Sequence, residues 1–176
     1  MISYSMGLSA DGYIAGPDGS FDWAAPSQEL HRFHNERVAA TDAHLLGRRL
    51  YETMLVWDTE EFSDPVMAEF AEIWRPLEKI VFSTTLTRVE GSNRLATGTI
   101  EEEIAALGDR RIAVGGAGLP AVCLRRGVID GFGLVVVAVV LGGGTPYFPP
   151  DVQIDLELVE TRTFDATVHL HYRRRG

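Results

Sequence analysis

Arg111-Ile-Ala-Val-Gly-Gly-Ala-Gly-Leu-Pro-Ala-Val-Cys-Leu124 is the stretch that decides the fold, because a β-branched run breaks into glycines and then into a helical pattern. Ile112 to Val114 suit a buried strand, Gly115 and Gly116 allow a turn with positive φ, and Pro120 fits the first turn of a helix. A helix that starts on glycines presents free backbone N–H groups and the positive end of its dipole. Such a start favours an anion, most often a phosphate, as its ligand.

The segment Gly116-Ala-Gly-Leu-Pro-Ala121 also matches the dinucleotide-binding fingerprint, with alanine in place of the third glycine. A Rossmann fold would place this turn in its first βα unit and an acidic residue at the end of the next strand. Here the turn falls two-thirds of the way along the chain, and Asp130 precedes the next strand. The motif alone therefore leaves two alternatives, a phosphate-binding turn and a structural turn without a ligand.

Length and charge limit the classes of protein to which the chain can belong. With 176 residues, of which 45% are hydrophobic, we expect one domain that spans residues 1–176. The 25 acidic and 16 basic residues give a net charge of −9, which opposes binding to nucleic acid or to an anionic membrane. Lys79 is the sole lysine, so the other basic residues are arginines, whose planar fork suits contact with phosphate.

Cys123 is the only cysteine, which excludes an intrachain disulfide and a metal site built on cysteines. We therefore expect a reducing, cytoplasmic location, and the N-terminus has no signal-peptide pattern. His31 and His34 are spaced for a shared metal, but no third ligand and no His-Glu-x-x-His pattern accompany them, so no metal site is expected. The longest apolar run, Leu134 to Leu141, is too short to span a bilayer as a helix.

Predicted strands and helices alternate along the chain on both sides of the central stretch. Ser27 is positioned to cap a helix that ends near Ala39, and Thr99 to Glu102 form a capping box. The chain after Val152 alternates twice between apolar and polar residues. The predicted strands cover residues 2–8, 43–46, 79–83, 93–97, 112–114 and 131–141, with two more between 152 and 172, and the other predicted helices begin near residues 47, 66 and 118. This order predicts a mostly parallel α/β sheet with an antiparallel C-terminal edge.

Two further features suggest a ligand. Arg48 and Arg49 stand in the first turn of a predicted helix, where the dipole disfavours cations, so the pair suggests a bound anion. The long loop from Pro17 to Pro26 carries Phe21 and Trp23, and such loops are often functional. The alternative is that these two aromatic side chains only anchor the loop on the core.

Five motifs, in order along the chain, resemble those of a known family. They are Ser9-Ala-Asp-Gly-Tyr-Ile-Ala15, Gly47-Arg-Arg-Leu-Tyr-Glu52, Phe82-Ser-Thr-Thr85, Val114-Gly-Gly-Ala-Gly118 and Val140-Leu-Gly-Gly-Gly-Thr-Pro-Tyr-Phe148. The set is similar to the dihydrofolate-reductase fold, and most closely to stand-alone relatives of the reductase domain of the riboflavin-biosynthesis deaminase-reductase. The resemblance covers nearly the whole chain. It implies a three-layer α/β fold whose central sheet has about eight strands.

The resemblance also implies a site for NADPH and a neighbouring site for substrate. The cofactor residues that it implies are Ile14, Ala15, Gly16, Gly47, Arg48, Arg49, Ser83, Thr84, Gly115, Gly116, Ala117, Gly118 and Leu119. In the substrate site it implies Glu29 for proton relay or substrate anchoring, Trp23 as a lid and Phe33 as a stacking wall, together with Asp11 and Tyr147.

The function implied is an NADPH-dependent reductase of a small heterocyclic substrate, either pterin-like or similar to a 5-amino-6-ribosylamino-pyrimidine. The first alternative is a non-catalytic module that binds NADPH or senses a ligand, and Leu50, in place of the threonine usual in the family, favours it. The second, a nucleic-acid-binding domain, is disfavoured by the net charge. A homodimer formed through the C-terminal part of the sheet is also expected.

Overall fold

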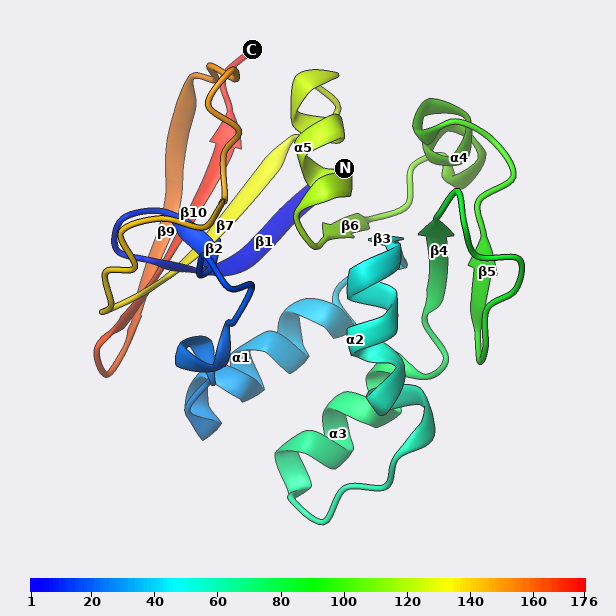
Figure 1. Ribbon diagram of the computed structural model, residues 1–176, viewed down its shortest axis with the longest axis horizontal. Helices are drawn as coiled ribbons and strands as arrows, with labels where there is room; N and C mark the ends of the chain where they lie inside the picture. Colours follow the sequence, from blue (N-terminus) through cyan, green and yellow to red (C-terminus); the bar gives the residue numbers. More distant parts are fainter.

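The computed structural model describes residues 1–176 (Figure 1). Its main sheet comprises eight strands: β1 (Ile2–Ser9), β3 (Ala43–Gly47), β4 (Glu78–Phe82), β5 (Asn93–Leu95), β6 (Ile112–Gly115), β7 (Gly131–Val137), β9 (Leu156–Phe164) and β10 (Thr167–Arg174). Their order across the sheet is β5-β4-β3-β6-β1-β7-β10-β9. The first six are mutually parallel, whereas β10 is antiparallel to both β7 and β9. The predicted mostly parallel sheet with an antiparallel C-terminal edge is confirmed.

Five helices cover the two faces of this sheet and complete a three-layer structure (Figure 1). They are α1 (Gln28–Ala39), α2 (Arg48–Thr59), α3 (Pro65–Trp74), α4 (Ile100–Leu107) and α5 (Gly118–Arg125), and a short 3-10 helix, η1 (Asp22–Ala24), precedes α1. The Ser27 hydroxyl accepts from the Leu30 N–H, and Thr99 and Glu102 form both bonds of the capping box, as predicted. No helix is both long and apolar enough to cross a membrane.

Two predicted boundaries were wrong, and contacts between segments distant in the sequence explain both. Strand β7 ends at Val137, not at Leu141, because the Asp11 carboxylate accepts hydrogen bonds from the Leu141 and Gly142 N–H groups at 3.1 and 2.7 Å. The segment predicted as a break after β1 contains a short strand, β2 (Tyr13–Ala15), which pairs with β8 (Thr145–Pro146). This pairing joins residues about 130 positions apart, so local sequence patterns could not reveal it.

The two faces of the central strands differ in composition. On one face Ile2, Tyr4 and Leu8 of β1 join the main apolar core, which also contains residues of α4 and α5. Side chains alternate along a strand, so Ser3 and Ser5 of β1 face the layer that contains α1, α2 and α3. This second face is small and polar where the first is large and apolar. On β1 this face therefore lines a cavity, whereas on β3 and β4 the same side of the sheet carries Leu46 and Val81 of a second apolar cluster.

Candidate active site

Two helix starts lie side by side at the carboxyl ends of neighbouring strands. Strand β3 leads into α2 through Gly47, and β6 leads through Gly115 to Ala117 into α5. The strands are paired in parallel, with Leu46 opposite Gly115. A Cβ built on Gly47 would lie 3.6 Å from the Cβ of Leu119, so the first turns of both helices are in close proximity.

Neither of these helix starts has a side-chain cap. The N-cap residues are Gly47 and Ala117, and neither accepts a hydrogen bond from the helix that follows. By contrast, side chains of Ser27, Asp64 and Thr99 cap α1, α3 and α4. The free N–H groups and dipole ends of α2 and α5 therefore converge on one place, which is an arrangement that can bind phosphate groups.

The sequence predicted a positive φ at both glycines before α5, and the structure has it at one of them. Gly116 has a φ of +88°, whereas Gly115 has no positive φ. Gly115 is instead restricted by space, because a Cβ there would lie 2.4 Å from Cδ2 of Leu50. A Cβ on Gly118 would meet nothing within 4 Å, so the backbone at the start of α5 is open to a ligand.

Next to α2 lies an open groove of about 480 Å³, lined by Arg48 and by Ser83, Thr84 and Thr85 after β4. The Arg48 guanidinium donates to Glu52 at 2.7 Å and to the Thr85 hydroxyl at 2.9 Å. The Ser83 hydroxyl accepts from the backbone N–H groups of Thr85 and Leu86, which fixes the turn. The structure thus brings Arg48, Ser83 and Thr84 together, while Arg49 is exposed and does not line the groove.

The predicted nicotinamide segment, Ile14 to Gly16, is held rigidly. Gly144 lies so close that a Cβ there would be 2.0 Å from the Ala15 carbonyl oxygen, and Gly144 has a φ of +127°. The carboxylate of Asp11 fixes the same loop by its bonds to Leu141 and Gly142. Asp11 thus holds two loops together, and it does not line the cavity described next.

A cavity of about 290 Å³, here called the chamber, lies between the sheet and the layer of α1, α2 and α3. Its lining includes Leu50 and Gly115, which belong to the two strand–helix junctions described above. Its apolar lining includes Met54, Phe70 and the ring of Trp74, and its polar lining consists of Ser3, Ser5, His34, Arg37, Thr41 and His44. None of the lining residues is acidic.

Several polar groups of the chamber have no partner within the protein. Nε2 of His44 and Nε1 of Trp74 are buried and form no hydrogen bond. Burial lowers the pKa of His34 to about 4 and that of His44 also to about 4, so both imidazoles are neutral at pH 7. Burial also lowers the pKa of Arg37, yet a guanidinium stays charged near neutrality.

The five residues expected in the catalytic and substrate site do not line the chamber. Glu29 is exposed, Phe33 packs on Phe164 and His169 in a separate apolar cluster, and the Trp23 indole donates to the Ser20 carbonyl. Tyr147 is 2% exposed and donates its hydroxyl to the Tyr4 carbonyl at 2.9 Å, so it belongs to the main core. The Asp11 carboxylate holds two loops together, as described above.

Sequence patterns do not identify Ser5, His34, Arg37, His44 and Trp74 as one site. Two signals were present in the sequence. Small polar residues occupy every second position of β1, and His44 interrupts an apolar strand. Neither signal indicates which helix lies opposite, and that information decides whether the face is a cavity wall.

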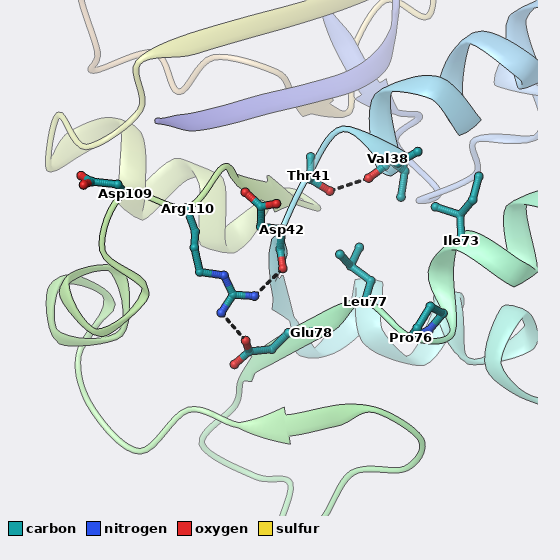
Figure 2. Close-up of a pocket in the computed structure, with 10 residues that line it drawn as sticks. Val38, Thr41, Asp42, Ile73, Pro76, Leu77, Glu78, Asp109 and Arg110 are labelled. Carbon is teal, nitrogen blue, oxygen red and sulfur yellow. Dashed lines mark hydrogen bonds and ion pairs between the residues drawn. The ribbon is translucent and has the colours of Figure 1, made fainter.

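A larger open groove, of about 740 Å³, lies elsewhere, where β3 and β4 begin (Figure 2). Figure 2 shows Arg110 between Asp42 and Glu78, and its guanidinium donates to the Glu78 carboxylate and to the Asp42 carbonyl, both at 2.6 Å. The charges of Arg110 and Glu78 are thus paired with each other, and the Asp42 carboxylate is paired with Arg111. This groove is also at the opposite end of the strands from the two uncapped helix starts, so it is not the candidate active site.

Comparison with known proteins identifies the family and the fold of the chain. Two uncharacterized Bacillus subtilis (strain 168) proteins are similar over 95% of the chain: YyaP at 29% identity over 90% of its length, and YwjB at 30% identity over 94%. Among solved structures, a Shewanella sp. PV-4 protein named for riboflavin biosynthesis has a TM-score of 0.80 at 22% identity, with 99% of each chain covered.

An Enterococcus faecalis dihydrofolate reductase solved with NADP(H) has a TM-score of 0.67 at 15% identity, with 100% of this chain and 97% of the other covered. These two solved structures confirm the predicted fold. The family model for the RibD C-terminal domain matches residues 1–170. The chain therefore belongs to the RibD C-terminal domain family.

Proposed function

We propose that this protein is an NADPH-dependent reductase of a small heterocyclic substrate. The observation that carries the proposal is the pair of uncapped helix starts, α2 and α5, beside which Leu50 and Gly115 line the chamber. An anion site beside a small cavity is what a reductase needs to hold a dinucleotide against its substrate. Bound NADPH would supply the hydride, and the protein supplies position, exclusion of water and a proton.

In this proposal the N–H groups from Gly115 to Leu119 bind the pyrophosphate, with Gly47 on the facing helix. Arg48, Ser83 and Thr84 bind the adenosine end, including its 2′-phosphate, because they line one groove and Arg48 offers a rigid donor fork. Ile14, Ala15 and Gly16 lie along the nicotinamide. Arg49 is exposed beside the groove, and we assign it at most a long-range electrostatic effect on the phosphates.

The chamber would hold the ring that is reduced. Neutral imidazoles can both accept and donate a proton, and His34 and His44 are the histidines of the chamber lining. Glu29 is exposed and outside the chamber. We therefore assign the proton relay to these histidines in place of Glu29.

The test is a comparison of NADPH and NADH binding by calorimetry. Arg48→Ala should weaken NADPH binding by about 1.5–3 kcal/mol, the range for a hydrogen bond to a charged group, and NADH binding much less. Arg32→Ala provides a matched control, because Arg32 is an exposed arginine of α1 that lines neither groove nor chamber. Equal losses for both dinucleotides would contradict the assignment of Arg48 to the 2′-phosphate.

A further inference from the structure

We infer that the chamber prefers substrates whose ring carries a carboxylate or neighbouring oxo oxygens, bound by Arg37, His44 and Trp74, over rings that present amino groups in their place. The inference rests on the proposed function, because it names the class of acceptor that such a reductase would take. It follows from the chemistry of the chamber wall, which provides hydrogen-bond donors and no carboxylate.

The donor set comes from three different elements. Arg37 stands on α1, His44 on β3 and Trp74 at the end of α3, and all three line the chamber. Trp74 is 2% exposed, and its indole N–H can only donate. Because that N–H and Nε2 of His44 form no hydrogen bond within the protein, a ligand that supplied acceptor oxygens would satisfy them.

Arg37 provides the positive charge. It forms no ion pair with any carboxylate of the chain. Glu160 acts on it electrostatically, but the Glu160 carboxylate is already paired with Arg162 at 2.7 Å. A half-buried guanidinium without a counter-ion is unfavourable, and an anionic ligand would remove that cost.

The same wall disfavours an aminopteridine or a diaminopyrimidine. The ring amino groups of such molecules donate hydrogen bonds and need an acceptor, for which a carboxylate is the strongest choice. The chamber has no acidic residue, and it would place ring N–H groups against the guanidinium of Arg37. The acceptors that the wall does offer are the hydroxyls of Ser3, Ser5 and Thr41 and the neutral imidazoles, which bind ring amino groups more weakly than a carboxylate would.

The volume of the chamber also limits the size of the substrate. The chamber volume of about 290 Å³ lies at the lower end of the range of roughly 300–1,000 Å³ for ligand pockets. One heterocyclic ring with small substituents fits this volume, and a larger substituent would have to extend out of the chamber.

Orotate, a dioxopyrimidine with a carboxylate, is a suitable probe for this chemistry. Calorimetry should show that the protein, saturated with NADPH, binds orotate about 10-fold or more tightly than uracil, which lacks the carboxylate. It should also bind orotate more tightly than 2,4-diaminopyrimidine, a single ring with amino groups. Diaminopyrimidine binding as tight as that of orotate would overturn the inference, as would no preference for orotate over uracil.

Substitutions of chamber residues test which side chains bind the oxygens of the ligand. Arg37→Gln should weaken orotate binding about 10-fold or more and leave uracil nearly unaffected, while Arg32→Gln, on the exposed side of the same helix, should change neither. Trp74→Phe keeps an aromatic ring but removes the indole N–H and makes the side chain smaller, so it tests the chamber independently if Arg37→Gln folds poorly. If orotate affinity is unchanged in both Arg37→Gln and Trp74→Phe, these side chains do not bind the oxygens.

NADPH titration on the same samples separates the two proposals. Normal NADPH binding without the preference for orotate would leave the reductase proposal intact and overturn this inference. The preference for orotate without any NADPH binding would contradict the proposed function and support the chamber chemistry alone.

Discussion

The single lysine of the chain illustrates how a buried charge is accommodated. Lys79 on β4 is fully buried, and its ammonium group donates to the Trp74 carbonyl at 2.7 Å and to the Ser92 hydroxyl at 2.8 Å. It also pairs at 3.3 Å with Asp58, whose side chain is 7% exposed. Each of these two buried charges is stabilised by the other, because neither can interact with bulk water.

Lys79→Met should therefore lower the free energy of unfolding by about 3–5 kcal/mol, because it leaves the carboxylate of Asp58 buried without its partner. Urea unfolding followed by circular dichroism measures the change. The double variant Lys79→Met, Asp58→Leu removes both charges and should recover part of the loss. A loss below about 1 kcal/mol in the single variant would show that the pair is dispensable.

Three histidines, of which His169 is fully buried and His34 and His44 are half-buried, predict how stability depends on pH. Burial lowers the pKa values of His34, His44 and His169 to about 4 each. An unfolded histidine has a pKa near 6.5, so between pH 6.5 and 4 the unfolded state binds more protons than the folded state. Stability should thus be complete above about pH 6.5 and be lost progressively as the pH falls toward 4.

Thermal unfolding between pH 8 and pH 4 tests this expectation. His169 is fully buried, and both of its ring nitrogens lack a partner within the protein. His169→Gln removes one of the titrating groups, so it should make the pH dependence shallower than that of the parent protein. A melting temperature that is constant from pH 6.5 to 4 in the parent would contradict the shifted pKa values.

At the scale of elements, the sequence was informative where the signal is local. Helix-capping residues, glycines and the periodic spacing of apolar residues identified all five helices and the eight strands of the main sheet, because each of these signals acts within a few residues. The end of β7 and the pair β2 and β8 depend on Asp11 and Gly144, whose partners are more than 120 residues distant. Tertiary contacts of this kind have no local pattern.

The candidate site likewise has one part that the sequence predicts and one part that it does not. The glycine turns after β3 and β6 could be predicted, because a strand that leads through glycine into a helix is a continuous stretch of chain. The chamber combines one face of β1 with side chains of α1, β3 and α3, so its donors are separated in sequence. Glu29 illustrates the difficulty, since it adjoins the buried Leu30 and yet is itself exposed.

At the scale of the whole molecule, β9 forms one edge of the main sheet. Leu158 and Val159 on this strand are 52% and 53% exposed. Exposed apolar residues on an edge strand favour pairing with a second chain. We therefore predict a homodimer that uses this C-terminal edge.

Light scattering at micromolar concentration should give twice the chain mass of 19.4 kDa. Leu158→Glu should shift the protein toward the monomer, because it would bury a charge in the contact. Val122→Glu is a matched control on α5, away from β9. A monomeric mass for the parent protein at every accessible concentration would exclude the dimer.

The molecule as a whole is organised around the point where α2, α5 and the chamber meet. Gly118 is the most informative residue at this point. It begins α5 without a positive φ, and a Cβ there would meet no neighbouring atom within 4 Å. A change at Gly118 can therefore affect a ligand without affecting the fold. Gly116, with a φ of +88°, differs in this respect, because substitution there also strains the backbone.

NADPH titration of the parent protein and of Gly118→Val, with melting temperatures measured on the same samples, is the decisive experiment. The parent should bind NADPH, and Gly118→Val should bind it about 10-fold or more weakly with an unchanged or higher melting temperature, because only the approach of the pyrophosphate is blocked. Gly116→Val should lose both affinity and stability. If the folded Gly118→Val protein binds NADPH as tightly as the parent, or the parent does not bind it, the two helix starts are not the dinucleotide site.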